Sequence, residues 1–147
     1  MSTESRAGKL LANVDEPVCL DSIEVYDMSE MANLSPKRTG IDGVVIYAGR
    51  ADDRGKHSPY RIKVSVGKAW GASDKAFSMG IKGSTKGKWF RVKGSSYKAE
   101  SDVPAKYLKA ARLFIERNEQ LLIDWVDYDG LEDDSERFVP RVKSVKD

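Results

Sequence analysis

Residues 103–128, "VPAKYLKAARLFIERNEQLLIDWVDY", form the stretch on which the expected fold depends. Apolar side chains recur there at the three- and four-residue intervals of one helix face: Tyr107, Leu108, Ala111, Ile115, Leu122 and Trp125. Ser101 or Asp102 can cap the start, and Pro104 suits the first turn. Gly130 follows the end, so the sequence predicts one long amphipathic helix that closes there.

Four stretches upstream of this helix predict the strands of a sheet that it covers. Residues 60–66, "YRIKVSV", alternate strictly between apolar and polar side chains, as a half-exposed strand does. The alternation recurs at 77–82, "FSMGIK", and at 89–93, "WFRVK", and residues 44–47 are a short β-branched run. The expected fold is a two-layer α+β domain, with an antiparallel sheet of three or four strands and the helix on one face.

The same alternation predicts a basic face on the side of the sheet away from the helix. In residues 89–93 it turns Phe90 and Val92 inward and the other side chains outward. The residues expected to line this face are Arg61, Lys63, Lys82, Trp89, Arg91 and Lys93. A register shift of one residue would move any of these strands' side chains to the other face.

Charge is segregated along the chain. Residues 36–110 hold seventeen Lys and Arg against six acids, whereas residues 1–35 hold two against seven. We expect a flexible N-terminal tail at 1–17, a single domain at 18–130 and a charged C-terminal tail at 131–147. A basic block between acidic flanks indicates an anionic partner or internal charge pairing.

Two stretches resemble a family of small uncharacterised bacterial and phage proteins, the domain of unknown function 4160. They are "HSPYRIKV", which leads into a strand, and "RNEQLLIDW", near the end of the helix. The family is often encoded beside genes resembling toxin–antitoxin pairs. Its loop usually supplies several histidines, but this chain has only His57 there, with Arg61 and Lys63 at the following positions. The resemblance therefore implies a fold and no settled chemistry.

The sequence shows no cluster of residues suited to catalysis or to metal binding. His57 is the only imidazole, beside Asp52, Asp53 and Ser58 in one loop, and Cys19 is the only thiol. The stretch "DYDGLEDDSE" lacks the ligand spacing of a calcium loop, and the glycines match no phosphate-binding pattern. We therefore predict a protein that is not an enzyme and needs no cofactor. Two facing carboxylates, which only a structure can reveal, would instead favour a hydrolase.

The stretch "GSTKGKWFRVKGSSYK", residues 83–98, holds five cations, three aromatics and no acid. Cations spread over a surface with an aromatic among them suit phosphate binding and base stacking. The predicted nucleic-acid or anion-binding residues are Arg61, Lys63, Lys82, Lys88, Trp89, Arg91 and Lys93. Lysines on an edge strand also prevent aggregation, so the pattern alone does not settle a binding role.

Two binding functions remain open. One is a module that binds nucleic acid with low sequence specificity. The other is a protein–protein regulator, antitoxin-like or a phage-encoded inhibitor of a host system, which docks on an acidic protein surface. We expect a cytoplasmic protein with no membrane segment, since no secretory signal or long apolar run is present. Homodimerisation through an open sheet edge remains an alternative.

Overall fold

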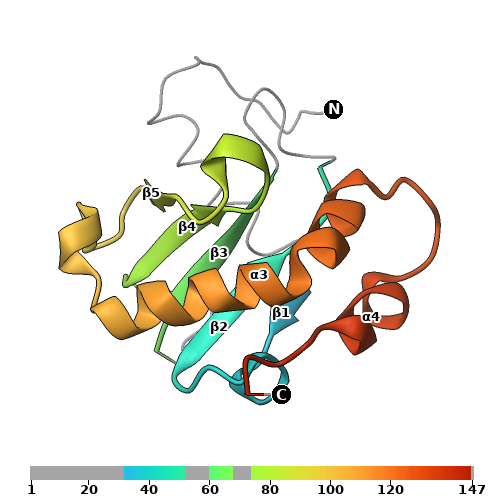
Figure 1. Ribbon diagram of the computed structural model, residues 1–147, viewed down its shortest axis with the longest axis horizontal. Helices are drawn as coiled ribbons and strands as arrows, with labels where there is room; N and C mark the ends of the chain where they lie inside the picture. Colours follow the sequence, from blue (N-terminus) through green and yellow to red (C-terminus); the bar gives the residue numbers. More distant parts are fainter. Residues whose placement is uncertain (1–31, 52–59, 68–73, 147) are drawn as a thin grey trace.

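The computed structural model describes residues 32–51, 60–67 and 74–146. They form an α+β fold with five antiparallel strands in chain order, on which one long helix packs (Figure 1). The strands are β1 (Ala32–Leu34), β2 (Val44–Ala48), β3 (Arg61–Val66), β4 (Ala76–Gly80) and β5 (Trp89–Arg91). The predicted fold class is confirmed, with five strands rather than three or four. The expected tail at 1–17 lies outside the described residues.

A row of apolar side chains crosses four strands and defines the face of the sheet that we call the core face. Leu34 pairs with Ile46, Ile46 with Val64, and Val64 with Phe77. Directly paired residues point to the same side of a sheet, so these four side chains form one continuous surface. All are buried. The alternation predicted for β3 and β4 is therefore confirmed on this face.

Helix α3 (Ala105–Asp127) lies across the core face, with Phe114, Ile115, Leu122 and Trp125 buried against the sheet (Figure 1). Its ends differ from the prediction. Pro104 occupies the N-cap position and Tyr128 the C-cap position, and neither Ser101 nor Asp102 caps the helix. None of the helices in the described ranges has the length and apolar character needed to cross a bilayer.

The carboxylate of Asp102 has a different role from the predicted one. It accepts hydrogen bonds from the backbone N–H groups of Lys98 (2.8 Å) and Ala99 (3.0 Å). These contacts fix the 3₁₀ turn η3 (Glu100–Asp102), which directs the chain from β5 into α3. A capping side chain satisfies whichever free N–H groups the local turn presents, and here the turn comes before the helix.

Strand β1 is followed by a single helical turn, α2 (Pro36–Thr39). The Ser35 hydroxyl accepts from the Arg38 N–H at 3.3 Å, and Pro36 begins the turn. Gly40 then adopts a φ of 83°, a left-handed conformation that favours glycine. The turn reverses the chain so that β1 can pair with β2.

Within the charged C-terminal tail expected at 131–147, residues 134–146 pack against the rest of the described structure. Helix α4 (Asp134–Arg137) and the 3₁₀ turn η4 (Val139–Arg141) flank Phe138, which is 2% exposed. The Phe138 ring stacks on Trp125 of α3, with centroids 5.1 Å apart. One aromatic side chain among charges has no periodicity to reveal it, yet its burial holds the segment.

Asn118 of α3 fastens the chain end to the helix. Its side-chain oxygen accepts from the Lys143 N–H at 2.7 Å, and its nitrogen donates to the Lys143 carbonyl at 2.9 Å. The same nitrogen donates to the Phe114 carbonyl at 3.0 Å. Further along, the Val145 N–H donates to the Thr39 carbonyl at 2.8 Å, so the segment also contacts α2.

Candidate functional site

The side chains of strand β5 point to the opposite faces of the sheet from those predicted. Trp89 pairs with Met79 and Arg91 with Phe77, which places both on the core face, while Phe90 pairs with Ser78 on the other side. The cause lies in the turn, where the 3₁₀ segment η2 (Gly83–Thr85) brings Gly80 against the chain at Lys86–Lys88. A turn of this length sets the register, and a shift of one residue reverses every side chain of the strand.

The predicted set therefore does not share one face. Arg61 and Lys63 lie on the side of the sheet opposite to Trp89 and Arg91. We call that side the second face, and one row of paired residues crosses all five strands on it. The row consists of Asn33, Tyr47, Lys63, Ser78 and Phe90.

Lys63 is also not at the surface, because only 2% of it is exposed. Next to the row, the Arg61 guanidinium lies over the Phe90 ring at 3.8 Å from its centroid, a cation–π contact. The prediction of an open basic face on this side of the sheet is wrong at its centre.

Lys82 lies elsewhere, beside the C-terminal end of α3. Its ammonium nitrogen sits 4.2 Å from the centroid of the Tyr60 ring. The Tyr60 hydroxyl donates to a carboxylate oxygen of Asp127 at 2.6 Å, and this hydrogen bond raises the pKa of Tyr60. These contacts join the residue before β3 to the C-terminal end of α3.

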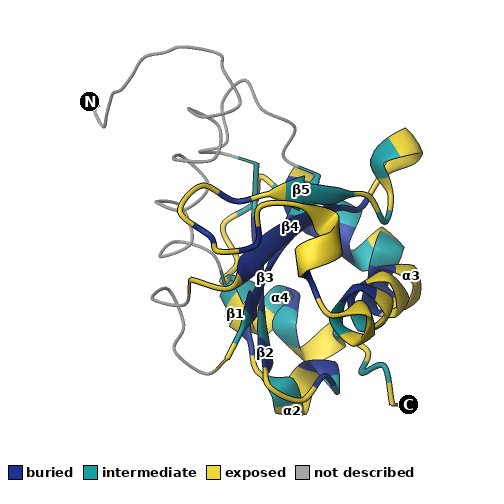
Figure 2. Ribbon diagram, turned by 90° about the vertical axis from the view of Figure 1, so that its left-hand side faces the viewer, coloured by how far each residue is buried: buried dark blue, intermediate teal, exposed yellow. Residues whose placement is uncertain are grey.

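The remaining cations of the predicted set stay together at the sheet edge. Strand β5 itself lies at the edge of the sheet, beside β4 (Figure 2). Lys88, Arg91 and Lys93 are exposed on or beside β5, and Trp89 between them is half-buried against the core. We call these four residues the β5 surface. Since no acid lies between residues 83 and 98, its positive charge is not neutralised from within its own stretch.

Helix α3 anchors the turn that precedes the β5 surface. Lys86 forms an ion pair with Glu119 at 2.7 Å, and Glu119 raises the pKa of the Lys86 ammonium. Arg112 donates to the Gly87 carbonyl at 2.9 Å and pairs with Glu100 at 3.0 Å. The sequence reasoning missed these contacts. Their only signal was that positions 112 and 119 are two helical turns apart, on one stripe of α3.

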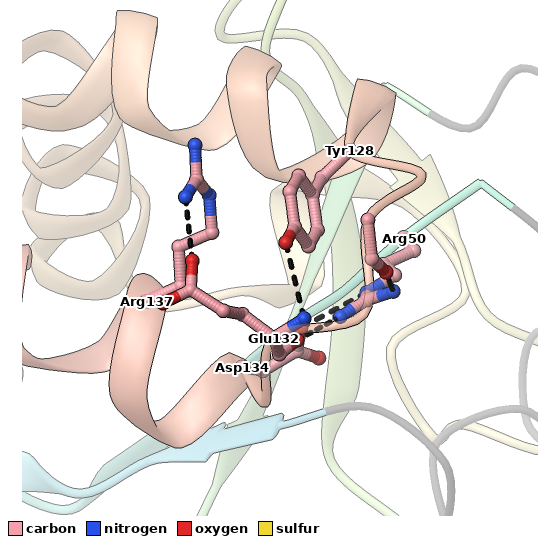
Figure 3. Close-up of polar contacts among 6 residues, drawn as sticks. Arg50, Tyr128, Glu132, Asp134 and Arg137 are labelled. Atoms are coloured by element: carbon pink, nitrogen blue, oxygen red, sulfur yellow. Dashed lines mark hydrogen bonds and ion pairs between the residues drawn. The ribbon is translucent and has the colours of Figure 1, made fainter.

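A second polar cluster, also missed, joins β2 to the chain end (Figure 3). The Arg50 guanidinium reaches Asp134 at 3.1 Å and the Gly130 carbonyl at 2.8 Å. The guanidinium carbons of Arg50 and Arg137 lie 4.6 and 4.5 Å from the centroid of the Tyr128 ring. Glu132 accepts from Arg137 at 2.6 Å, which raises the pKa of Arg137. The cluster contains two ion pairs, Arg50 with Asp134 and Arg137 with Glu132. It holds the chain end against the segment that follows β2.

The residues considered for chemistry fall mostly outside the described ranges. Cys19, Asp52, Asp53, His57 and Ser58 all lie there. Within residues 32–51, 60–67 and 74–146, no group of three or more His, Cys, Asp or Glu side chains is arranged to hold a metal ion.

Comparison of the chain with family models, curated proteins and solved structures found no match. The resemblance to the domain of unknown function 4160 thus stays a prediction. The proposals below depend on the residues and their geometry.

Proposed function

We propose that this protein is a non-enzymatic binding module whose β5 surface binds single-stranded nucleic acid with low sequence specificity. The observation that carries the proposal is the acid-free stretch 83–98, which places three exposed cations on a sheet edge. Lys88, Arg91 and Lys93 contact phosphates, which carry charge but no sequence information.

The register of β5 limits how far the Trp89 indole can stack on a base. Because the indole packs partly on the core, only its outer portion is available to a base. Stacking contributes about 1–3 kcal/mol per base where an aromatic face is open, so a half-buried ring adds less than this. Phosphate contacts therefore dominate affinity, and the tryptophan responds to a bound strand next to it.

Charge reversal at the three exposed cations tests the proposal. The variant Lys88→Glu, Arg91→Glu, Lys93→Glu should bind a short single-stranded oligonucleotide at least about tenfold more weakly at low salt. A matched control carries the same charge change on other exposed cations, Lys37→Glu, Arg38→Glu and Lys143→Glu. Equal affinity in both variants would show that the β5 surface is not the binding site.

The position of β5 at the end of the sheet favours a second candidate, a regulator that docks on an acidic protein. Among the described strands β5 is an edge strand that pairs with β4, and an edge strand is where a partner can add a strand of its own. An extended acidic segment of a partner would satisfy both the backbone groups and the cations. Affinity capture before and after nuclease treatment separates the two functions, since a protein partner survives the nuclease.

A further inference from the structure

Charge is distributed along helix α3 in the reverse of the order that stabilises a helix. Residues 103–115 contain three cations and no acid, whereas residues 116–127 contain four acids and one cation. The partial positive charge at the N-terminal end of a helix disfavours cations there, and the negative C-terminal end disfavours acids. No acid lies in the first turn of α3 and no cation in its last turn. Helix stability therefore does not account for the two lysines near its start, Lys106 and Lys109.

The two lysines are exposed, and the acids that precede them in the chain have other partners. Glu100 pairs with Arg112 at 3.0 Å. The Asp102 carboxylate accepts from two backbone N–H groups of its own turn. In the described part of the chain, neither Lys106 nor Lys109 forms an ion pair with an acid. Their positive charge is thus presented to solvent, where an anion can bind it.

Arg112 joins this part of α3 to the β5 surface. Its guanidinium donates to the Gly87 carbonyl at 2.9 Å, and Gly87 directly precedes Lys88. Lys109 lies one turn before Arg112 on the helix, and side chains three positions apart on a helix are neighbours. Strand β5, the turn η3 and the first turns of α3 lie together at one end of the molecule, on the left in Figure 1. The exposed cations of α3 thus extend the β5 surface past the Arg112 side chain.

Acids limit this basic area in the other direction along the helix. Glu116 and Glu119 lie one and two turns beyond Arg112. Glu116 is exposed, and Glu119 neutralises Lys86 in the turn before β5. Carboxylates repel phosphates, so a bound polyanion avoids that half of α3. The favourable direction runs from the β5 surface towards the start of the helix.

We infer that a single-stranded nucleic acid bound at the β5 surface continues onto the first two turns of α3, where Lys106 and Lys109 contact its phosphates. This extension rests on the proposed function, and it adds two residues and a direction to the site. A strand long enough to reach both elements contacts the two helix lysines as well as the three cations of the β5 surface. A strand that fills the β5 surface alone contacts only those three cations.

Single strands of two lengths test the extension with the full chain. An end-labelled oligothymidine of about four nucleotides should occupy the β5 surface, and one of about twelve should also reach α3. At roughly 0.7 per phosphate contact, the logarithm of the binding constant should fall with the logarithm of salt concentration at a slope of about −2 for the shorter strand and about −3.5 for the longer. Equal slopes for two bound strands would overturn the extension and leave the proposed function standing. No binding of either strand at low salt would overturn both.

Removal of the two lysine charges locates the added contacts. The variant Lys106→Gln, Lys109→Gln should bind the longer strand at least about tenfold more weakly at low salt, and the shorter strand within about twofold of the native protein. The matched control, Arg117→Gln with Arg141→Gln, removes the same charge from exposed cations elsewhere. It should leave both affinities within about twofold. Equal weakening in the two variants would overturn the extension, because net charge alone would then explain the loss.

Protection of lysines from a small amine reagent gives a readout on the native protein that needs no variant. With either strand bound, Lys88 and Lys93 should react at least about threefold more slowly, because a phosphate contact shields the ammonium. Lys106 and Lys109 should be protected to this extent by the longer strand and not by the shorter. Exposed Lys37 serves as the reference and should react at one rate throughout.

Unprotected Lys106 and Lys109 in the complex with the longer strand would overturn the extension. Urea denaturation of the glutamine variant separates binding from a structural role. Since cations near the start of a helix do not stabilise it, the variant should unfold at the native midpoint. The protection pattern of the native protein decides the matter if the variant does not fold.

Discussion

Replacement of Asn118 by alanine should weaken the attachment of the C-terminal segment. Asn118 is 2% exposed, and its side chain makes two hydrogen bonds with the Lys143 backbone and one with the Phe114 carbonyl. The substitution leaves the partly buried N–H and carbonyl of Lys143 without these partners. At about 1 kcal/mol for each bond lost, we expect the free energy of unfolding to fall by about 2–3 kcal/mol.

Urea denaturation followed by circular dichroism measures this loss, and thermal unfolding should show a midpoint lower by roughly 5–10 °C. Trypsin should also cleave after Arg141 or Lys143 sooner than in the native protein, because the segment opens locally. Gln120→Ala is the matched control, since that exposed amide on α3 bonds only Asp124 in the described structure. A loss for Asn118→Ala below about 0.5 kcal/mol, equal to that of the control, would refute the reasoning.

Three further predictions concern the buried Phe138 ring, the turn at Gly40 and the pKa of Tyr97. Phe138→Ala should cost about 3–5 kcal/mol in urea denaturation, since the ring is buried on Trp125; a tail-like residue would show almost no change. Gly40→Ala should cost about 1–3 kcal/mol, because φ is positive and a Cβ would meet the Ser144 hydroxyl; an unchanged midpoint would contradict this. Burial raises the pKa of Tyr97 above its usual 10.0. The fold thus favours its neutral form, so stability from Tyr97 is complete below about pH 10 and is lost as pH rises through the folded pKa. Phenolate absorbance of the native protein and a Tyr97→Phe variant measures this, and ionisation at the ordinary pKa would contradict it.

The parts of the fold that follow a regular period could be predicted from the sequence. Helix α3 buries side chains at a period near 3.6, and Ile62 and Val64 of strand β3 lie on the core face as expected, although Lys63 and Ser65 on the other face of β3 are buried as well. Strand β5 has only three residues, and the geometry of the preceding turn decides its facing. No local pattern contains that information, so Trp89 and Arg91 were assigned to the wrong face.

The candidate site was predictable only in part for the same reason. The charge of residues 83–98 is a property of composition, and it remains at the sheet edge whichever way β5 faces. The anchoring contact of Arg112 with Gly87 joins residues 25 positions apart in the chain. Likewise, Phe138 and Asn118 hold the chain end through tertiary contacts that leave no periodic trace.

The salt dependence of oligonucleotide binding by the native protein tests the proposed function most directly. Tryptophan fluorescence should follow titration with a short single strand and with a duplex at several salt concentrations. With three phosphate contacts, the logarithm of the binding constant should fall with the logarithm of salt concentration at a slope of about −2 for the single strand. Such a slope, with a change in tryptophan emission, is the result we predict. No binding of either oligonucleotide at low salt would contradict a nucleic-acid function for the β5 surface.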